Sequence, residues 1–210
     1  MKREGVLVVI SGFSGAGKGT IVKRLMSKFD DYALSISMTT RAPREGEVDG
    51  REYFFSTKEE FEDRIQKDGL IEYACYCGNY YGTPRDYVEK QLADGRDVIL
   101  EIEIQGAMKV KEKFPETLLL FVMPPSAGVL KERLVGRGTE TADVIADRLS
   151  RAVEESAGIE QYDYIVVNDD LEECVDRVHM LIDSAHNAPC HNQEFITELR
   201  KELREFGKEQ

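Results

Sequence analysis

The sequence predicts an α/β fold, in which one parallel sheet is covered by helices on both faces. Short apolar runs typical of buried strands alternate along the chain with segments of helical spacing, a pattern typical of parallel sheets. The alternation is interrupted between residues 37 and 87, where aromatic-rich pieces predict an inserted, strand-rich subdomain. A chain of 210 residues is long enough for one domain of this kind with an insertion.

Four apolar runs are the expected strands of the main sheet. They are VLVVI at 6–10, DVILEIEI at 97–104, TLLLFVM at 117–123 and YDYIVV at 162–167. Helical spacing is clearest in GTIVKRLMSKF at 19–29 and DLEECVDRVHMLIDSA at 170–185. A tail helix is also expected, with apolar residues along one side at Phe195, Leu199, Leu203 and Phe206. We expect that side to pack on the chain's own domain, and the alternative is contact with a second subunit.

Composition narrows the class of protein. A formal net charge of −12 argues against a surface that neutralises a nucleic-acid backbone. No apolar run reaches the length of a membrane span or of a signal-peptide core, so the sequence predicts a cytoplasmic protein with no nucleic-acid or membrane partner. The four cysteines form no paired CxxC motifs, which favours reduced thiols. Because the protein as a whole is acidic, an anionic ligand must be bound by a local cationic site.

A glycine-rich loop follows the first expected strand. The segment from Gly12 to Lys18 fits the pattern GxxxxGK, and helical spacing begins directly after it. In such a loop, backbone N–H groups and the helix N-terminus bind phosphate, and the lysine reaches the β- and γ-phosphates of a nucleoside triphosphate. Gly19 stands where these loops usually place the Ser or Thr that ligates magnesium. The order of strand, loop and helix argues against a simple surface turn.

A second cationic group lies in SMTTRAPREGEVDGREYFF at 37–55. Arg41 and Arg44 are three residues apart around a proline, and two guanidinium groups held close together suit a dianionic phosphate. We expect the hydroxyl groups of Ser37, Tyr53 and Tyr81 to join them. The alternative is a pair of ordinary solvated arginines in a polar loop.

Glu72 stands within the apolar and aromatic segment GLIEYACYCGNYYGTPRD. Burial of a carboxylate costs free energy unless the group is paired or hydrogen-bonded. Guanine offers adjacent N1–H and N2–H donors to a carboxylate, whereas adenine presents an acceptor at N1, so Glu72 is a candidate reader of a purine base. The alternative is an edge-strand glutamate that faces water.

Two further carboxylates lie in DVILEIEI. Strand alternation places Glu101 and Glu103 on one face. A carboxylate at the end of a central parallel strand is suited to order magnesium or its water ligands, and the neighbouring carboxylate is then within reach of a bound base. An amphipathic edge strand is the competing explanation.

A polar, glycine-bearing segment, GRGTETADV at 136–144, has the composition of a mobile segment. Arg133, Arg137 and Arg148 lie in it or beside it. A lid that closes over two phosphates brings arginines to the transferring phosphoryl group, whose negative charge they stabilise. The alternative is a set of helical arginines in ion pairs with neighbouring acidic residues.

Taken together, these motifs resemble those of guanylate kinase, in the family's order and spacing. Six segments carry the resemblance: SGFSGAGKGT, SMTTRAPREGEVDGREYFF, IEYACYCGNYYGT, ILEIEIQGA, RLVGRGTET and VVNDD. The resemblance implies a nucleoside-monophosphate kinase, with a P-loop parallel sheet flanked by helices, a GMP-binding insertion and a mobile lid. The implied reaction transfers the γ-phosphoryl group of Mg-ATP to GMP or dGMP, with Mg²⁺ as the cofactor.

The resemblance also implies domain boundaries and residue roles. The core would comprise 1–36, 88–135 and 149–187, the GMP-binding subdomain 37–87, the lid 136–148 and a C-terminal helical extension 188–210. The implied catalytic residues are Lys18, Arg44, Arg137 and Arg148. ATP would bind Gly12, Phe13, Ser14, Gly15, Ala16, Gly17, Lys18, Gly19, Thr20, Arg133, Arg137 and Asn168. GMP would bind Ser37, Arg41, Arg44, Tyr53, Glu72, Tyr81, Thr83 and Glu103, and Glu101 would face magnesium through water.

Three positions depart from the family's pattern. Gly19 replaces the usual Ser, Phe13 replaces the usual Pro, and Glu101 replaces the usual Asp. Two other functions stay open: a guanylate-kinase-like scaffold that binds partner peptides, and a P-loop kinase that acts on a sugar phosphate. The intact loop around Lys18 argues against the scaffold, and the guanine-reading set argues against the sugar kinase. The sequence is compatible with a monomer or a homodimer.

Overall fold

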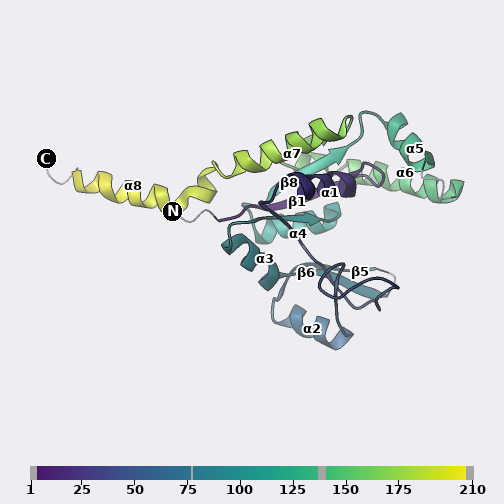
Figure 1. Ribbon diagram of the computed structural model, residues 1–210, viewed down its shortest axis with the longest axis horizontal. Helices are drawn as coiled ribbons and strands as arrows, with labels where there is room; N and C mark the ends of the chain where they lie inside the picture. The colour runs from purple at the N-terminus through teal and green to yellow at the C-terminus, as the bar shows by residue number, and fades with distance from the viewer. Residues whose placement is uncertain (1–3, 77, 137–140, 207–210) are drawn as a thin grey trace.

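The computed structural model describes residues 4–76, 78–136 and 141–206, and Arg137 lies outside the described residues. Its main sheet has five parallel strands in the order β2 (Tyr32–Leu34), β7 (Asp97–Glu101), β1 (Leu7–Gly12), β8 (Leu118–Met123) and β9 (Tyr164–Val167). The chain therefore crosses from one side of β1 to the other between β7 and β8 (Figure 1). Ligands of such sheets bind at the carboxyl ends of the strands near this crossover.

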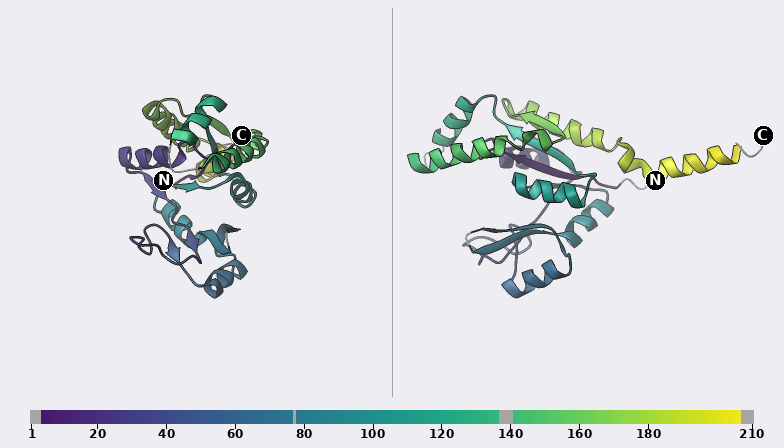
Figure 2. Two further views of the ribbon diagram at one scale, coloured as in Figure 1. Left: turned by 90° about the vertical axis from the view of Figure 1, so that its right-hand side faces the viewer. Right: turned by 180° about the vertical axis from the view of Figure 1, so that it is seen from behind.

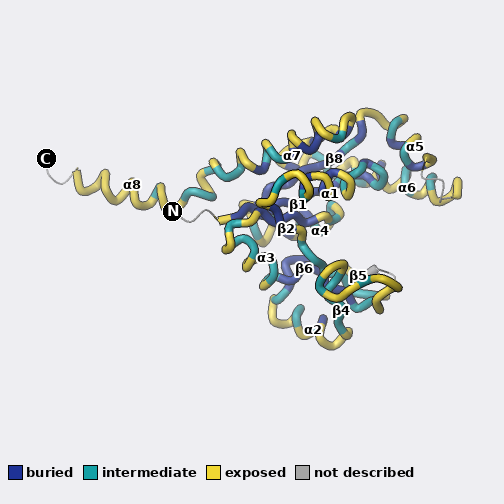
Figure 3. The backbone as a smooth tube through the Cα atoms, viewed as in Figure 1, coloured by how far each residue is buried: buried dark blue, intermediate teal, exposed yellow. Residues whose placement is uncertain are grey.

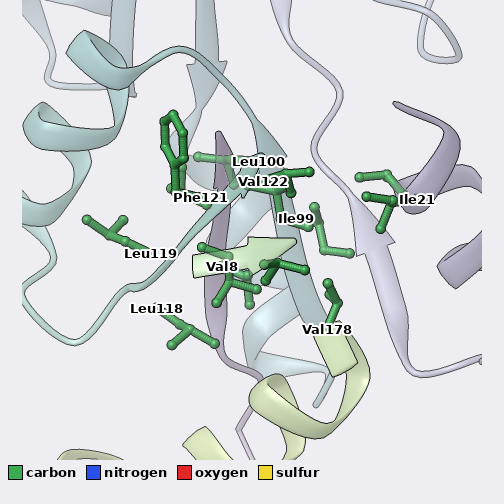
Figure 4. Close-up of a cluster of buried hydrophobic side chains, with 14 of the residues drawn as sticks. Val8, Ile21, Ile99, Leu100, Leu118, Leu119, Phe121, Val122 and Val178 are labelled. Atoms are coloured by element: carbon green, nitrogen blue, oxygen red, sulfur yellow. The ribbon is translucent and has the colours of Figure 1, made fainter. Parts of the chain in front are cut away.

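Helices cover both faces of the main sheet. One face carries α1 (Lys18–Lys28) and α7 (Leu171–Ala185), which pack side by side. The other face carries α4 (Ile104–Lys113) and α6 (Ala142–Ser156), as Figure 2 shows. Figure 4 shows side chains of α1 and α7, Ile21 and Val178, on the side of the sheet opposite Phe121. The α/β fold with a parallel sheet between helices is as the sequence predicts.

Burial on both faces explains why the central strands are almost purely apolar. The residues from Val8 to Ile10, from Val98 to Leu100 and from Leu119 to Val122 are all fully buried. Strands of a parallel sheet need such continuous apolar runs because both their faces pack against helices. This core fixes the positions of the strand ends, from which the functional loops leave.

The insertion forms a second sheet beside α4. Its strand order is β4 (Phe54–Phe55), β3 (Met38–Thr39), β6 (Asn79–Pro84) and β5 (Leu70–Tyr76). Helix α2 (Lys58–Gln66) begins with a capping box, in which Thr57 Oγ1 accepts from the Glu60 backbone N–H and the Glu60 carboxylate accepts from the Thr57 backbone N–H. Phe61 of α2 is fully buried in a small core of its own. Helix α3 (Arg85–Ala93) returns the chain to the main sheet.

The expected strand at 97–104 is too long. Strand β7 ends at Glu101, and α4 begins at Ile104 with Glu103 as its N-cap residue. The pairing of β7 with β1 stops at Ile10 and Glu101, so the chain has no ladder to continue beyond this point. Glu101 and Glu103 therefore do not share a strand face. The competing explanation, an amphipathic edge strand, is also wrong, because β7 lies between β2 and β1 in the sheet.

The lid segment lies between α5 (Ala127–Gly136) and α6. Of the expected lid 136–148, Gly136 is the last residue of α5, Thr141 is the N-cap residue of α6, and the residues from 142 onward form the first turns of α6. The short helix η1 (Ile159–Gln161) then leads to β9.

The tail departs from expectation. After α7, the short helix η2 (Pro189–Asn192) leads into α8 (Gln193–Phe206), which extends away from the body of the molecule (Figures 1 and 3). None of its residues is buried, and Phe195, Leu199, Leu203 and Phe206 are 43–71% exposed. The expectation that α8 packs on its own domain is wrong. At η2, where the tail turns away, Asn192 Nδ2 donates to the carbonyl oxygens of His186 and Ala188, and α8 continues from there into solvent.

Candidate functional site

The glycine-rich loop joins the end of β1 to α1, in the central position of the sheet. At Gly12, with φ of 153°, a Cβ would lie 2.1 Å from the carbonyl oxygen of Val122, so no other residue fits. Gly17 caps α1 in the left-handed region, with φ of 95°. The strand, the loop and the helix N-terminus thus have the arrangement that binds phosphate.

Phe13 anchors the loop in the core. It is 8% exposed, and its ring meets that of Phe121 edge to face, with centroids 5.1 Å apart. An aromatic residue at this position therefore serves as a packing residue for the loop.

Lys18 folds back over the loop. Its Nζ donates to the carbonyl oxygens of Gly12 at 2.6 Å and of Phe13 at 3.3 Å. A cavity of ≈ 620 Å³ opens beside it, lined by Phe13, Ser14, Gly15, Gly17, Lys18, Gly19, Thr20, Lys23 and Glu101. The cavity therefore joins the expected phosphate-binding loop to the expected magnesium-side carboxylate.

Two residues predicted to bind ATP meet at the carbonyl oxygen of Ala16. Asn168 is 7% exposed, and its Nδ2 donates to that oxygen at 2.8 Å. Arg133 donates to the same oxygen at 3.4 Å and to the Asn168 carbonyl oxygen at 2.8 Å. Both side chains therefore stabilise the loop through hydrogen bonds to the backbone carbonyl of Ala16, in addition to the contact with ATP that is predicted for them.

Arg148 links α6 to the glycine-rich loop. Its Nη1 donates to Ser14 Oγ at 2.5 Å. The two residues are far apart in the sequence, and the contact places a guanidinium group of α6 at the rim of the cavity that Ser14 lines. Arg148 therefore lies where a phosphoryl group bound to the loop would meet it.

The Arg41 side chain and the Arg44 backbone both bind one carboxylate, that of Glu47. Arg41 binds Glu47 through both terminal nitrogens, at 2.9 Å each, and the backbone N–H of Arg44 donates to the same carboxylate at 2.7 Å. The Arg41 guanidinium also lies over the ring of Tyr53, 5.3 Å from its centroid. The rings of Tyr53 and Tyr81 have centroids 6.0 Å apart. Four of the five residues predicted around the phosphate are thus brought together, and Ser37 lies directly before β3 in the same sheet.

Glu72 is buried, at 9% exposure, so the alternative of a water-facing glutamate is wrong. Its Oε1 accepts a hydrogen bond from Thr83 Oγ1 at 2.8 Å, across the β5–β6 pair. Its Oε2 faces the first turn of α4, where a Cβ on Gly106 would lie 3.5 Å away. Burial raises the pKa of Glu72, and the bond from Thr83 opposes that shift. Glu103 is the N-cap residue at the same end of α4, and its side chain makes no capping hydrogen bond, so the structure joins Glu72 to Thr83 and leaves the reading role of Glu103 a prediction.

Glu101 lies against Gly19. A Cβ on Gly19 would stand 3.6 Å from one carboxylate oxygen of Glu101 and 3.7 Å from the other. The carboxylate therefore lies at ordinary contact distance from the place where a side chain at position 19 would begin. Burial raises the pKa of Glu101, and the charge of Lys18 opposes that shift.

Two residues escaped the sequence reasoning. Lys23 lines the cavity from α1, and the available signal was its helical spacing from Gly19 and Thr20, which lie four and three residues before it on the same side of the helix. Glu47 binds the arginine loop, and its signal was an acidic residue close to two arginines in a loop expected to bind an anion.

Comparison with known proteins decides the family. The guanylate kinase family profile matches residues 4–185. This chain belongs to the guanylate kinase family. Curated guanylate kinases from Bacillus cereus and Caldanaerobacter subterraneus are 54% and 47% identical to it, over 88% and 96% of this chain and 90% and 98% of theirs. The crystal structure of guanylate kinase from Anaplasma phagocytophilum matches with a TM-score of 0.69 and 34% identity, over 90% of both chains. Guanylate kinases are ATP:GMP phosphotransferases, and the chain is an enzyme of this class.

Across the described part of the chain, no helix is both long and apolar enough to span a membrane.

Proposed function

We propose that this guanylate kinase transfers the γ-phosphoryl group of Mg-ATP to GMP, and also to dGMP, giving ADP and the nucleoside diphosphate. The observation that carries the proposal is the buried Glu72, whose carboxylate is held by Thr83 and faces the end of α4. Membership of the guanylate kinase family supports the same reaction. A buried carboxylate matches the N1–H and N2–H edge of guanine and leaves adenine without a complementary donor pair.

The residues divide between the two nucleotides. The loop from Gly12 to Thr20 would bind the ATP phosphates, with Arg133 and Asn168 behind it and Arg148 at its rim. The group around Arg41 and Arg44 would bind the GMP phosphate. Glu72, Thr83 and Glu103 would read the base. Arg137 is proposed to act on the transferring phosphoryl group from its place in the family motif alone.

The reaction needs little proton chemistry. The nucleophile is a phosphate oxygen of GMP, which carries negative charge near neutral pH because the second pKa of a phosphate monoester is about 6. The obstacle is repulsion between two polyanions. Lys18 and the arginines lower it by neutralising charge, and the rigid loop aligns the donor phosphate.

The residues around Gly19 fit a magnesium ion. Magnesium prefers carboxylate and water oxygens and is commonly held by one or two carboxylates together with substrate phosphates. The Glu101 carboxylate takes the space beside Gly19, so an oxygen ligand stands near the usual hydroxyl position. Glu101 would hold magnesium through water, and the ion, when bound, would neutralise charge on the ATP phosphates.

Replacement of Glu101 by alanine is expected to raise the magnesium concentration for half-maximal activity by about tenfold, because the substitution removes one carboxylate from a site otherwise made of phosphates and water. A magnesium titration of the steady-state rate at fixed ATP measures this. Gly19→Ser is the matched control: its Cβ would make only ordinary contact with Glu101, so we expect activity within about threefold of wild type. An unchanged magnesium requirement in Glu101→Ala would contradict this role.

The proposal needs no macromolecular partner. We infer a cytoplasmic enzyme that acts without nucleic acid or membrane, because ATP and GMP are cytoplasmic metabolites and the chain carries a net charge of −12. The described site residues come from a single chain, so a monomer and a homodimer are both compatible with the activity.

A coupled assay of ADP release tests the function. ATP is offered with GMP, dGMP, AMP or UMP at equal concentration. We expect release with GMP and dGMP and near-background rates with AMP and UMP. A scaffold domain would bind a peptide without GMP-dependent release of ADP, and that result would overturn the proposal.

A further inference from the structure

We propose that Glu47 is a positioning residue of the GMP phosphate site, which holds the Arg41 guanidinium in its binding orientation before the nucleotide arrives. This inference rests on the proposed function and adds to it a residue that none of the motifs assigned. Glu47 lies in the loop between β3 and β4, among the residues expected to bind phosphate.

The geometry of Arg41 separates its two hydrogen-bonding edges. The end of the guanidinium group, Nη1 and Nη2, faces the two carboxylate oxygens of Glu47 at 2.9 Å each. A second bond runs from Nη1 to the carbonyl oxygen of Ala42 at 2.8 Å. These bonds use three of the five N–H groups of an arginine, and the other two form the side edge at Nε and Nη2. A second bidentate edge therefore stays directed away from Glu47.

That side edge is suited to phosphate. Arginine binds phosphate through two parallel N–H groups, and the pair at Nε and Nη2 has this geometry. The Tyr81 ring lies beside that of Tyr53, over which the Arg41 guanidinium is placed, and Tyr81 belongs to the residues expected around the phosphate. Glu47 and a bound phosphate therefore contact different edges of the same guanidinium group, and the carboxylate holds the arginine without competing with the ligand.

Glu47 also fixes the loop. Its Oε2 accepts the backbone N–H of Arg44 at 2.7 Å, so one carboxylate joins both arginines of the pair. The side chains of Arg41 and Glu47 are 15% and 17% exposed, and the rings of Tyr53 and Phe55 lie 5.3 and 5.9 Å from the guanidinium carbon of Arg41. Because this pair is already ordered, binding of phosphate costs less side-chain entropy here than it would at a free surface arginine.

The decisive variant is Glu47→Gln, which keeps the length of the side chain but presents an amide N–H group to a guanidinium donor. Glu45→Gln is the matched control, because Glu45 lies two residues away in the same loop and is exposed. We expect Glu47→Gln to raise the KM for GMP and the GMP dissociation constant about 10- to 100-fold. The kcat should change by less than about threefold. Glu45→Gln should match wild type.

Calorimetric titration with GMP and with guanosine locates the effect. Guanosine lacks the phosphate, so Glu47→Gln should bind it as wild type does, which also shows that the base pocket is folded. Equal or tighter GMP binding by Glu47→Gln overturns the inference, as does an equal loss for GMP and guanosine. Failure of wild type to bind GMP would instead refute the proposed function, so the two failures are distinguishable.

Discussion

Replacement of Lys18 by methionine is expected to lower kcat by about 10³-fold or more, because the ammonium group neutralises charge on the phosphates at the point of transfer. Nζ of Lys18 lies over the loop, bonded to the carbonyl oxygens of Gly12 and Phe13, and faces the cavity. Methionine keeps most of the aliphatic stem and removes the charge. Single-turnover rates at saturating ATP and GMP measure the effect on transfer.

Lys23→Met is the matched control for this variant. Lys23 lines the same cavity from an exposed position on α1, where solvent screens its charge. We expect its kcat to stay within about threefold of wild type. If Lys18→Met retained activity within about tenfold of wild type, the loop would not have the role proposed for it.

Glu72→Gln is expected to lower kcat/KM for GMP by about 10²- to 10³-fold while ATP binding changes little. The carboxylate accepts from both N1–H and N2–H of guanine, whereas the amide presents one acceptor and one donor, so a buried donor loses its partner. Steady-state kinetics with varied GMP measure kcat/KM, and calorimetric titration with ATP measures ATP binding. Unchanged GMP kinetics would remove Glu72 from base reading.

Protein stability provides the control for Glu72→Gln. Burial raises the pKa of Glu72 above 4.5, so the folded protein disfavours the charged form. This cost grows as the pH rises from the unfolded pKa through the raised folded pKa, and it is complete above that value. At pH 7 we therefore expect the unfolding temperature of ligand-free Glu72→Gln to be no lower than that of wild type. The advantage should shrink below a pH of about 4.5. A large drop at pH 7 would mean that the kinetic loss reflects unfolding.

The sequence was sufficient for the parts of the site that one motif specifies. The loop from Gly12 to Lys18 follows from spacing alone, because few backbones other than a strand, a tight turn and a helix N-terminus need glycines at these positions. Glu72 was recognisable because a carboxylate within an apolar segment is costly unless it has a function or a partner, and the structure provides the partner in Thr83.

What the sequence could not give depends on contacts between distant segments. The bracing of Ala16 by Asn168 and the contact of Arg148 with Ser14 each join residues more than 130 positions apart. The end of β7 is set by where its pairing with β1 stops, so strand alternation misplaced Glu103. Periodicity predicts that α8 has an apolar side. It does not show whether the chain folds back to cover that side, so the exposure of α8 could not be predicted.

Base discrimination tests the central claim most directly. The claim is that a buried carboxylate in the inserted sheet, together with an intact glycine-rich loop in the main sheet, makes this guanylate kinase specific for guanine. The measurement is kcat/KM of the wild-type enzyme for GMP, IMP and AMP under identical conditions. IMP keeps N1–H and lacks the 2-amino group, and AMP lacks both donors. We expect GMP to exceed AMP by about 10⁴-fold, with IMP between them. A ratio of GMP to AMP within about tenfold would contradict the account.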